Sequence, residues 1–180
     1  MLSPYVIVAI QSSLGLVMFA TLFRQHVLGR LQRADAYTAL AVVLMVHGLR
    51  FLGLTMLAPG QVDPGQDMDA LRVIAFGDLS AATVGIVAAL AAYRRSPLTV
   101  PLAWLLTVVG LGDIVLVSVT VAGAGVLESG IGVMWITFGL VVPLLVLSHG
   151  YVVYALLRRR DELSPAVVKT SLPPAVRQTR

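Results

Sequence analysis

The sequence predicts an all-α fold, a polytopic membrane helical bundle of five transmembrane helices, and two observations carry this prediction. Of the 180 residues, 58% are hydrophobic and 12% are charged, with a mean hydropathy of +0.90. A soluble domain has roughly 45–50% apolar and about 25% charged residues. Five apolar runs also approach the roughly 20 residues that a helix needs to cross a bilayer. Because lipid offers an unpaired backbone no partner, each run should be a helix.

The five runs lie at residues 5–23, 37–58, 70–93, 99–122 and 133–157. The first run has no basic residues before it and runs straight into Arg24, unlike a cleavable signal peptide. In the third run, Ala81, Gly85 and Ala89 recur at four-residue spacing, which is typical of closely packed membrane helices.

The fifth run contains Pro143, which should kink the helix and free a backbone carbonyl near Gly139. After Arg160 the chain reads "DELSPAVVKTSLPPAVRQTR", which is polar and rich in proline. We therefore expect one transmembrane domain at residues 1–160, followed by a flexible cytoplasmic tail at residues 161–180.

The basic residues predict the orientation of the bundle. Eleven of the thirteen lie in the first loop, the third loop and the tail, whereas loop two, "APGQVDPGQDMD", and loop four, "AGAGVLESG", contain no Lys or Arg. The positive-inside rule places the basic set in the cytoplasm. The N-terminus is then outside and the C-terminus is cytoplasmic, as an odd number of spans requires. His26, between Arg24 and Arg30, should be a solvated residue of the first loop.

Six polar side chains should lie at membrane depth, where an ionisable group costs a few kcal/mol or more and normally has a partner. At a rise of 1.5 Å per residue, the arginine and both aspartates fall about 4 Å to the outer side of the membrane centre, and the glutamine falls about 4–5 Å to that side. One histidine lies near the centre and the other about 6 Å to the inner side. The six are Gln11, His47, Arg50, Asp78, Asp113 and His149.

Arg50 is the centre of this predicted layer. A buried guanidinium needs carboxylate or carbonyl acceptors, and Asp78 and Asp113 lie at its depth. Two carboxylates and one guanidinium leave a net charge of about −1, or one carboxyl that holds a proton. His47 lies at i−3 from Arg50, on the same helix face, and is a candidate proton partner for the spare carboxylate. The inward face should then be His47, Arg50 and Leu54.

The chain has no cysteine, so disulfides and thiolate metal sites are excluded. We expect no cofactor. Haem between His47 and His149 is an alternative, against which their difference in depth of about 6 Å argues. A hard metal ion at the aspartates and histidines is another, but no pair has the i, i+3 or i+4 spacing of a helical chelate. The expected partner is membrane lipid, with a homo-oligomer or larger membrane complex as an alternative, and no nucleic acid.

Four segments carry a resemblance to known proteins: "HGLRFLGL" in the second run, "GDLSA" in the third, "GLGDIVL" in the fourth and "VVPLLVLSHG" in the fifth. In these segments, which span the four C-terminal runs, the chain resembles small multi-pass bacterial membrane proteins that are uncharacterised. The resemblance implies that His47, Arg50, Asp78, Asp113 and His149 belong to one pattern, and that the protein lies in the bacterial inner membrane. It implies no function.

Three functions remain open for this sequence. The polar layer could bind or transport a small or lipid-like ligand, with a linked proton. It could belong to an intramembrane enzyme that acts on a lipid or isoprenoid by acid/base chemistry, or it could hold together a structural or accessory subunit of a complex. A pocket lined by the carboxylates and open to one leaflet favours the enzyme. A cavity that reaches both sides, or a dimer interface across it, favours transport, and a fully satisfied, tightly packed layer favours the structural role.

Overall fold

The computed structural model describes residues 2–128, 131–132 and 134–163, which form helices and turns only. In chain order the elements are α1 (Pro4–Leu22), the π-helical η1 (Phe23–Val27), α2 (Leu28–Arg33), α3 (Ala36–Val46), the 3₁₀-helical η2 (His47–Leu57), α4 (Met68–Tyr93), α5 (Thr99–Gly123), the 3₁₀ turn η3 (Val126–Glu128), α6 (Met134–Ile136), the π-helical η4 (Thr137–Val141) and α7 (Val142–Arg158).

Five stretches of continuous helix are long and apolar enough to cross a membrane, which confirms the predicted all-α membrane bundle. They are Pro4–Arg33, Ala36–Leu57, Met68–Tyr93, Thr99–Gly123 and Met134–Arg158. Four of them match the predicted runs to within a turn at either end.

The first helix is longer than predicted. It passes through the π turn η1 and continues to Arg33, so His26 is an exposed helical residue and does not lie in a loop. No proline interrupts this stretch, so nothing stops the helix until Asp35. The Asp35 side chain accepts a hydrogen bond from the Thr38 backbone N–H at 3.1 Å, which caps the next helix.

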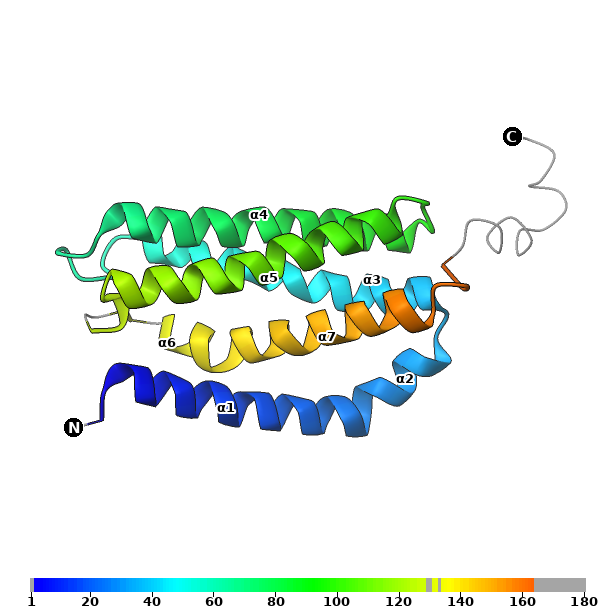
Figure 1. The fold of residues 1–180 in the computed structure, drawn as a ribbon, viewed down its shortest axis with the longest axis horizontal. Helices are drawn as coiled ribbons and strands as arrows, with labels where there is room; N and C mark the ends of the chain where they lie inside the picture. Colours follow the sequence, from blue (N-terminus) through cyan, green and yellow to red (C-terminus); the bar gives the residue numbers. More distant parts are fainter. Residues whose placement is uncertain (1, 129–130, 133, 164–180) are drawn as a thin grey trace, which may run out of the picture.

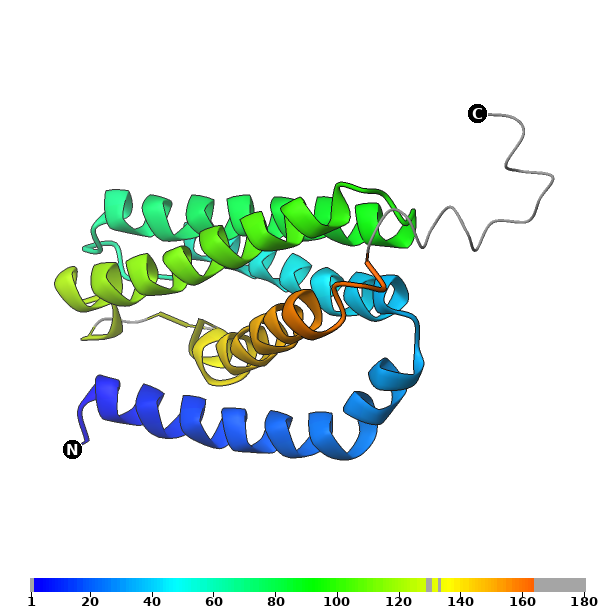
Figure 2. The same cartoon turned by 45° about the vertical axis from the view of Figure 1, so that its right-hand side comes forward.

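The helices lie roughly side by side along one axis (Figures 1 and 2). α4 packs against α3–η2 and α5, and α7 packs against both α3 and α5. α1 lies at the edge of the bundle, where it contacts α7 and η4. Few residues of α1 are buried, so most of its surface would face lipid or another chain.

The buried apolar residues form two clusters, one toward each end of the bundle. One includes Leu40, Leu44, Ala88, Leu106 and Val152. The other contains Met56, Leu71, Ile74, Val126 and Met134. On η2, α4 and α5, the predicted polar residues come between the residues of these two clusters in sequence. The polar layer therefore lies between two apolar layers, well away from both ends.

The contact between α1 and the fifth span is very close. Gly15 packs against the Gly139 carbonyl oxygen, so tightly that a Cβ at Gly15 would clash with it. The Ser12 hydroxyl donates a hydrogen bond of 2.9 Å to the Phe138 carbonyl. Pro143 has no N–H for the Gly139 carbonyl, as predicted, and the helix accommodates this with the π turn η4 immediately before α7.

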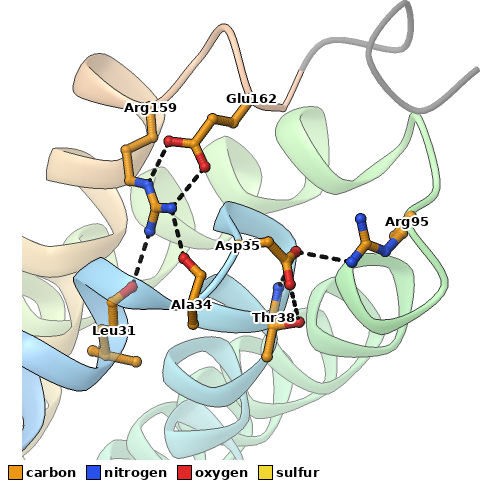
Figure 3. Close-up of polar contacts among 7 residues, drawn as sticks. All are labelled: Leu31, Ala34, Asp35, Thr38, Arg95, Arg159 and Glu162. Atoms are coloured by element: carbon orange, nitrogen blue, oxygen red, sulfur yellow. Dashed lines mark hydrogen bonds and ion pairs between the residues drawn. The ribbon is translucent and has the colours of Figure 1, made fainter. Parts of the chain in front are cut away.

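A cluster of polar contacts ties together the end of the bundle at which α7 ends (Figure 3). Arg159 donates to the carbonyls of Leu31 at 3.0 Å and Ala34 at 2.7 Å, which satisfies acceptors left at the end of α2. The same guanidinium holds both carboxylate oxygens of Glu162, at 2.9 and 2.6 Å. Asp35 forms an ion pair with Arg95 at 3.2 Å, which connects the turn between α4 and α5 to the start of α3.

The predicted tail at residues 161–180 lies outside the described residues from 164 onward. Of its first three residues, Asp161 is exposed and Glu162 is bonded to Arg159. Leu163 is buried, and its carbonyl accepts a hydrogen bond of 3.0 Å from the Tyr37 hydroxyl.

Candidate functional site

Arg50 joins three helices in the middle of the bundle. Its Nη1 donates to Asp113 Oδ2 at 2.6 Å and to Asp78 Oδ1 at 3.0 Å, and its Nη2 donates to the Gly110 carbonyl at 2.9 Å. The side chains of Arg50 and Asp113 are 1% and 5% exposed, whereas that of Asp78 is 17% exposed. The layer predicted from depth alone thus exists as a charge-assisted cluster that links η2, α4 and α5.

The 3₁₀ conformation of η2 places Arg50 in this layer. Side chains at i and i+3 eclipse in a 3₁₀-helix, and His47, Arg50, Gly53 and Met56 are all buried. The predicted inward face of His47, Arg50 and Leu54 is therefore wrong in its last member: Leu54 is only partly buried. The period along this half of the span is three residues, where an α-helix would have 3.6.

Glycines make room for the charged groups. A Cβ at Gly53 would lie 2.5 Å from Asp78 Oδ2, and a Cβ at Gly77 would come closer still to Asp113 Oδ1. A Cβ at Gly110 would lie 2.7 Å from the His149 ring and 3.5 Å from Arg50 Nη2. Sequence reasoning did not assign these glycines to the site. The only signal was their position in the sequence: Gly77 directly precedes Asp78, Gly110 lies three residues before Asp113, and Gly53 lies three residues after Arg50.

The two histidines form a pair beside Arg50. The ring centroids of His47 and His149 are 4.3 Å apart, and both side chains are buried. The difference in depth expected from residue counting is not seen, because the two spans pack with these positions level. The third run's small residues contribute here, since a Cβ at Gly85 would lie 2.7 Å from His47 Cβ.

Ser148, which the sequence did not single out, contacts His47. Its hydroxyl lies 2.8 Å from the Leu145 carbonyl oxygen and 3.0 Å from His47 Nε2, within hydrogen-bonding distance of both. His47 is thus bonded to a hydroxyl, and the predicted bond to a spare carboxylate is not formed among the described residues.

Gln11 does not join the layer. It lines a surface groove between α1 and the fifth span, together with Gly15, Trp135 and Gly139. This position agrees with a packing role for Gln11 at a helix–helix contact.

A cavity of 220 Å³ begins at the polar layer and extends toward the end of the bundle that carries the N-terminus. Arg50, Asp78 and Asp113 line it at one end, and most of its remaining wall is apolar, from α4, α5, α1 and the fifth span. Tyr5, Ser118 and Thr137 add hydroxyl groups to this wall. Toward the opposite end, the apolar cluster around Leu40 and Leu106 fills the bundle.

Among the described residues, no group of three or more His, Cys, Asp or Glu side chains lies close enough to hold a metal. Two axial imidazole nitrogens bound to one metal ion lie about 4 Å apart, and the centroids of their rings lie farther apart than the nitrogens. Imidazoles with centroids 4.3 Å apart therefore leave no space for a porphyrin between them.

One family model matches most of the chain. Residues 7–157 match a family described as "Domain of unknown function (DUF8737)". The chain belongs to this family. The DUF8737 match contains all five polar residues of the layer, His47, Arg50, Asp78, Asp113 and His149, and it includes most of the first span as well as the four spans that carry the resemblance. No curated protein and no solved structure matches the chain.

Proposed function

We propose that this protein binds a small amphipathic molecule, with an apolar body and a cationic or hydrogen-bond-donating head, in the cavity between α4, α5 and the fifth span. One observation carries the proposal: the cavity wall is mainly apolar, and its closed end presents the carboxylates of Asp78 and Asp113. An apolar site with a few convergent polar groups is the usual form of a small-molecule site.

The charge of the layer favours a cation over an anion. Arg50 contributes one positive charge and the two aspartates contribute two negative charges, so the layer is either anionic or holds a proton. Arg50 already donates from its two Nη nitrogens to Asp78, Asp113 and the Gly110 carbonyl. Its Nε has no partner among the described residues but is buried, so Arg50 is a fixed part of the wall and not a ready acceptor of an anionic head.

The cavity is confined to one half of the bundle, which supports binding from one side of the membrane. A cavity of this form that is lined by carboxylates is also the geometry expected of an acid/base enzyme. An acid/base enzyme acting on a lipid or isoprenoid is the second candidate, and it is favoured by the unequal surroundings of Asp78 and Asp113, with side chains 17% and 5% exposed. A structural subunit would explain the bonds that Arg50 makes to α4 and α5 but would not require a cavity.

The location belongs to the same proposal. The protein would be a multi-pass protein of the bacterial inner membrane with its N-terminus outside and its C-terminus in the cytoplasm, supported by the distribution of Lys and Arg. Because the chain has no cysteine, single cysteines at Gly65 and Arg94 would report the orientation. An impermeant maleimide should label Gly65→Cys in intact cells and Arg94→Cys only after lysis; the reverse pattern would overturn the orientation.

Ligand binding can be tested with the purified protein in nanodiscs. Decyltrimethylammonium, an amphipathic cation, should raise the melting temperature more than decanol or decyl sulfate at equal concentration. Val117→Phe, which fills the cavity, should abolish the rise. Val119→Phe, whose native side chain is 66% exposed on the same helix, is the matched control and should retain it. Equal responses to all three probes, or an unchanged response in Val117→Phe, would contradict the proposal.

A further inference from the structure

The cavity site contains one carboxylate more than its arginine neutralises, and this excess has to be balanced. The charged and titratable groups that face each other here come from four elements: Arg50 and His47 on η2, Asp78 on α4, Asp113 on α5, and His149 on α7. His47 is bonded to the Ser148 hydroxyl, and neither histidine is hydrogen-bonded to a carboxylate among the described residues. The cluster of Arg50 with two ionised aspartates would carry a buried charge of −1.

An uncompensated charge at membrane depth is costly, so the empty site is expected to hold either a proton or a bound cation. The two aspartates are not equally suited to hold the proton or to bind the cation. Asp113 makes the shorter bond to Arg50 Nη1, 2.6 Å against 3.0 Å for Asp78, and its side chain is the more buried. Asp78 is 17% exposed and lines the cavity, so a proton and a ligand can both reach it.

We propose that Asp78 exchanges one proton for one bound amphipathic cation, while Asp113 stays ionised as the permanent counter-ion of Arg50. In the empty site Asp78 is a neutral carboxylic acid. When the cationic head arrives, the Asp78 O–H bond breaks, the proton leaves to water, and the resulting carboxylate pairs with the cation. The net charge of the layer is zero before and after the exchange.

This inference rests on the proposed function, but it makes a separate prediction. Binding of a permanent cation should release a proton. The apparent Kd of the cation should therefore fall by about tenfold for each unit by which the pH rises, over the range in which Asp78 is protonated. The probe is decyltrimethylammonium, which has no proton of its own to lose. The number of protons released is obtained by titration calorimetry of the protein in nanodiscs, in two buffers with different ionisation enthalpies.

Release of about one proton per bound cation, together with the tenfold slope, is the expected result. Asp78→Asn should bind the cation weakly and without dependence on pH. Cation binding with no proton release and no pH dependence in the native protein would overturn the exchange but leave the proposed function standing. Failure of the native protein to bind any amphipathic cation would overturn the proposed function, and the exchange with it.

The assignment to Asp78 needs a second measurement, because in either single Asp→Asn variant the remaining carboxylate can pair with Arg50. Dicyclohexylcarbodiimide, an apolar reagent, reacts with protonated carboxyls in membranes. Peptide mapping by mass spectrometry should find the adduct on Asp78, and decyltrimethylammonium should prevent it. An adduct on Asp113 in place of Asp78 would overturn the division of roles.

Discussion

At the scale of single residues, the ion cluster works because one planar guanidinium reaches acceptors on two helices. Nη1 is shared by Asp78 and Asp113 while Nη2 caps the Gly110 carbonyl, an arrangement that the point charge of a lysine cannot reproduce. Either aspartate alone still leaves Arg50 with a partner. Removing both leaves an unpaired buried cation, which is the expensive case.

Paired substitutions therefore test the cluster. Asp78→Asn should change the melting temperature little, and Asp113→Asn should cost about 1–2 kcal/mol because it removes the shorter, more buried bond. The double variant should cost about 3–5 kcal/mol, more than the sum of the two. Thermal unfolding in detergent measures all three. Negligible losses for all variants would show that the cluster does not stabilise the bundle.

The glycine before each aspartate offers a matched pair. A Cβ at Gly77 would collide with Asp113 Oδ1, whereas nothing lies within 4 Å of a Cβ at Gly112. Gly77→Ala should displace Asp113 from Arg50 and lower the melting temperature. Gly112→Ala should be neutral or gain up to about 1 kcal/mol, since alanine favours helix. Equal effects would mean that the close approach at Gly77 is not required.

At the scale of elements, η2 decides which residues face the cavity. Sequence reasoning identified His47, Arg50 and the two aspartates because charge in a hydrophobic run is conspicuous and its depth follows from residue counting. It did not identify Gly53 and Met56, because composition does not distinguish a period of 3.0 from one of 3.6. The 3₁₀ run of eleven residues, longer than the usual three or four, is stabilised by contacts that only the folded bundle supplies.

Two glycines within or at the start of η2 test this geometry. A Cβ at Gly53 would lie 2.5 Å from Asp78 Oδ2, but a Cβ at Gly48 would meet only Ile86 atoms at 3.5 Å or beyond. We expect Gly53→Ala to lower both the melting temperature and the affinity for the cationic probe. Gly48→Ala, made in the same element, should leave both nearly unchanged. Loss in both variants alike would point to the flexibility of glycine as the relevant property and would argue against a specific contact with Asp78.

At the scale of the whole molecule, the five spans were predictable because bilayer thickness fixes helix length, and helix length can be read from hydrophobicity. The join between α2, α3 and α7 was not predictable. It depends on Arg159 reaching the Leu31 and Ala34 carbonyls, which lie more than a hundred positions away in the sequence. It also depends on Glu162, three residues along the chain, holding Arg159 in place. Sequence placed Glu162 in a flexible tail, yet the structure uses it to close one end of the bundle.

This closure should depend on pH. The two hydrogen bonds from the Arg159 guanidinium hold the pKa of Glu162 below its ordinary value of 4.5, so folding favours the ionised carboxylate. A group with a lowered pKa stabilises the fold fully above its unfolded pKa and loses that contribution as pH falls through the folded pKa. Because half of the Glu162 side chain is exposed, Glu162→Gln should cost only about 0.5–1 kcal/mol at pH 7.

The difference in melting temperature between the native protein and Glu162→Gln should therefore be constant above pH 4.5 and shrink below it. Asp161→Asn is the matched control, because Asp161 is fully exposed and lies 3.8 Å from Arg160, where an ion pair contributes little. It should match the native protein throughout. Asp35 also has a lowered pKa and titrates in all three proteins. Its repulsion of Glu162 is the weakest of the influences on the Glu162 pKa, so it alters the comparison little. A difference that stays the same from about pH 6 to about pH 3 would mean that Glu162 acts through packing, with no contribution from its charge.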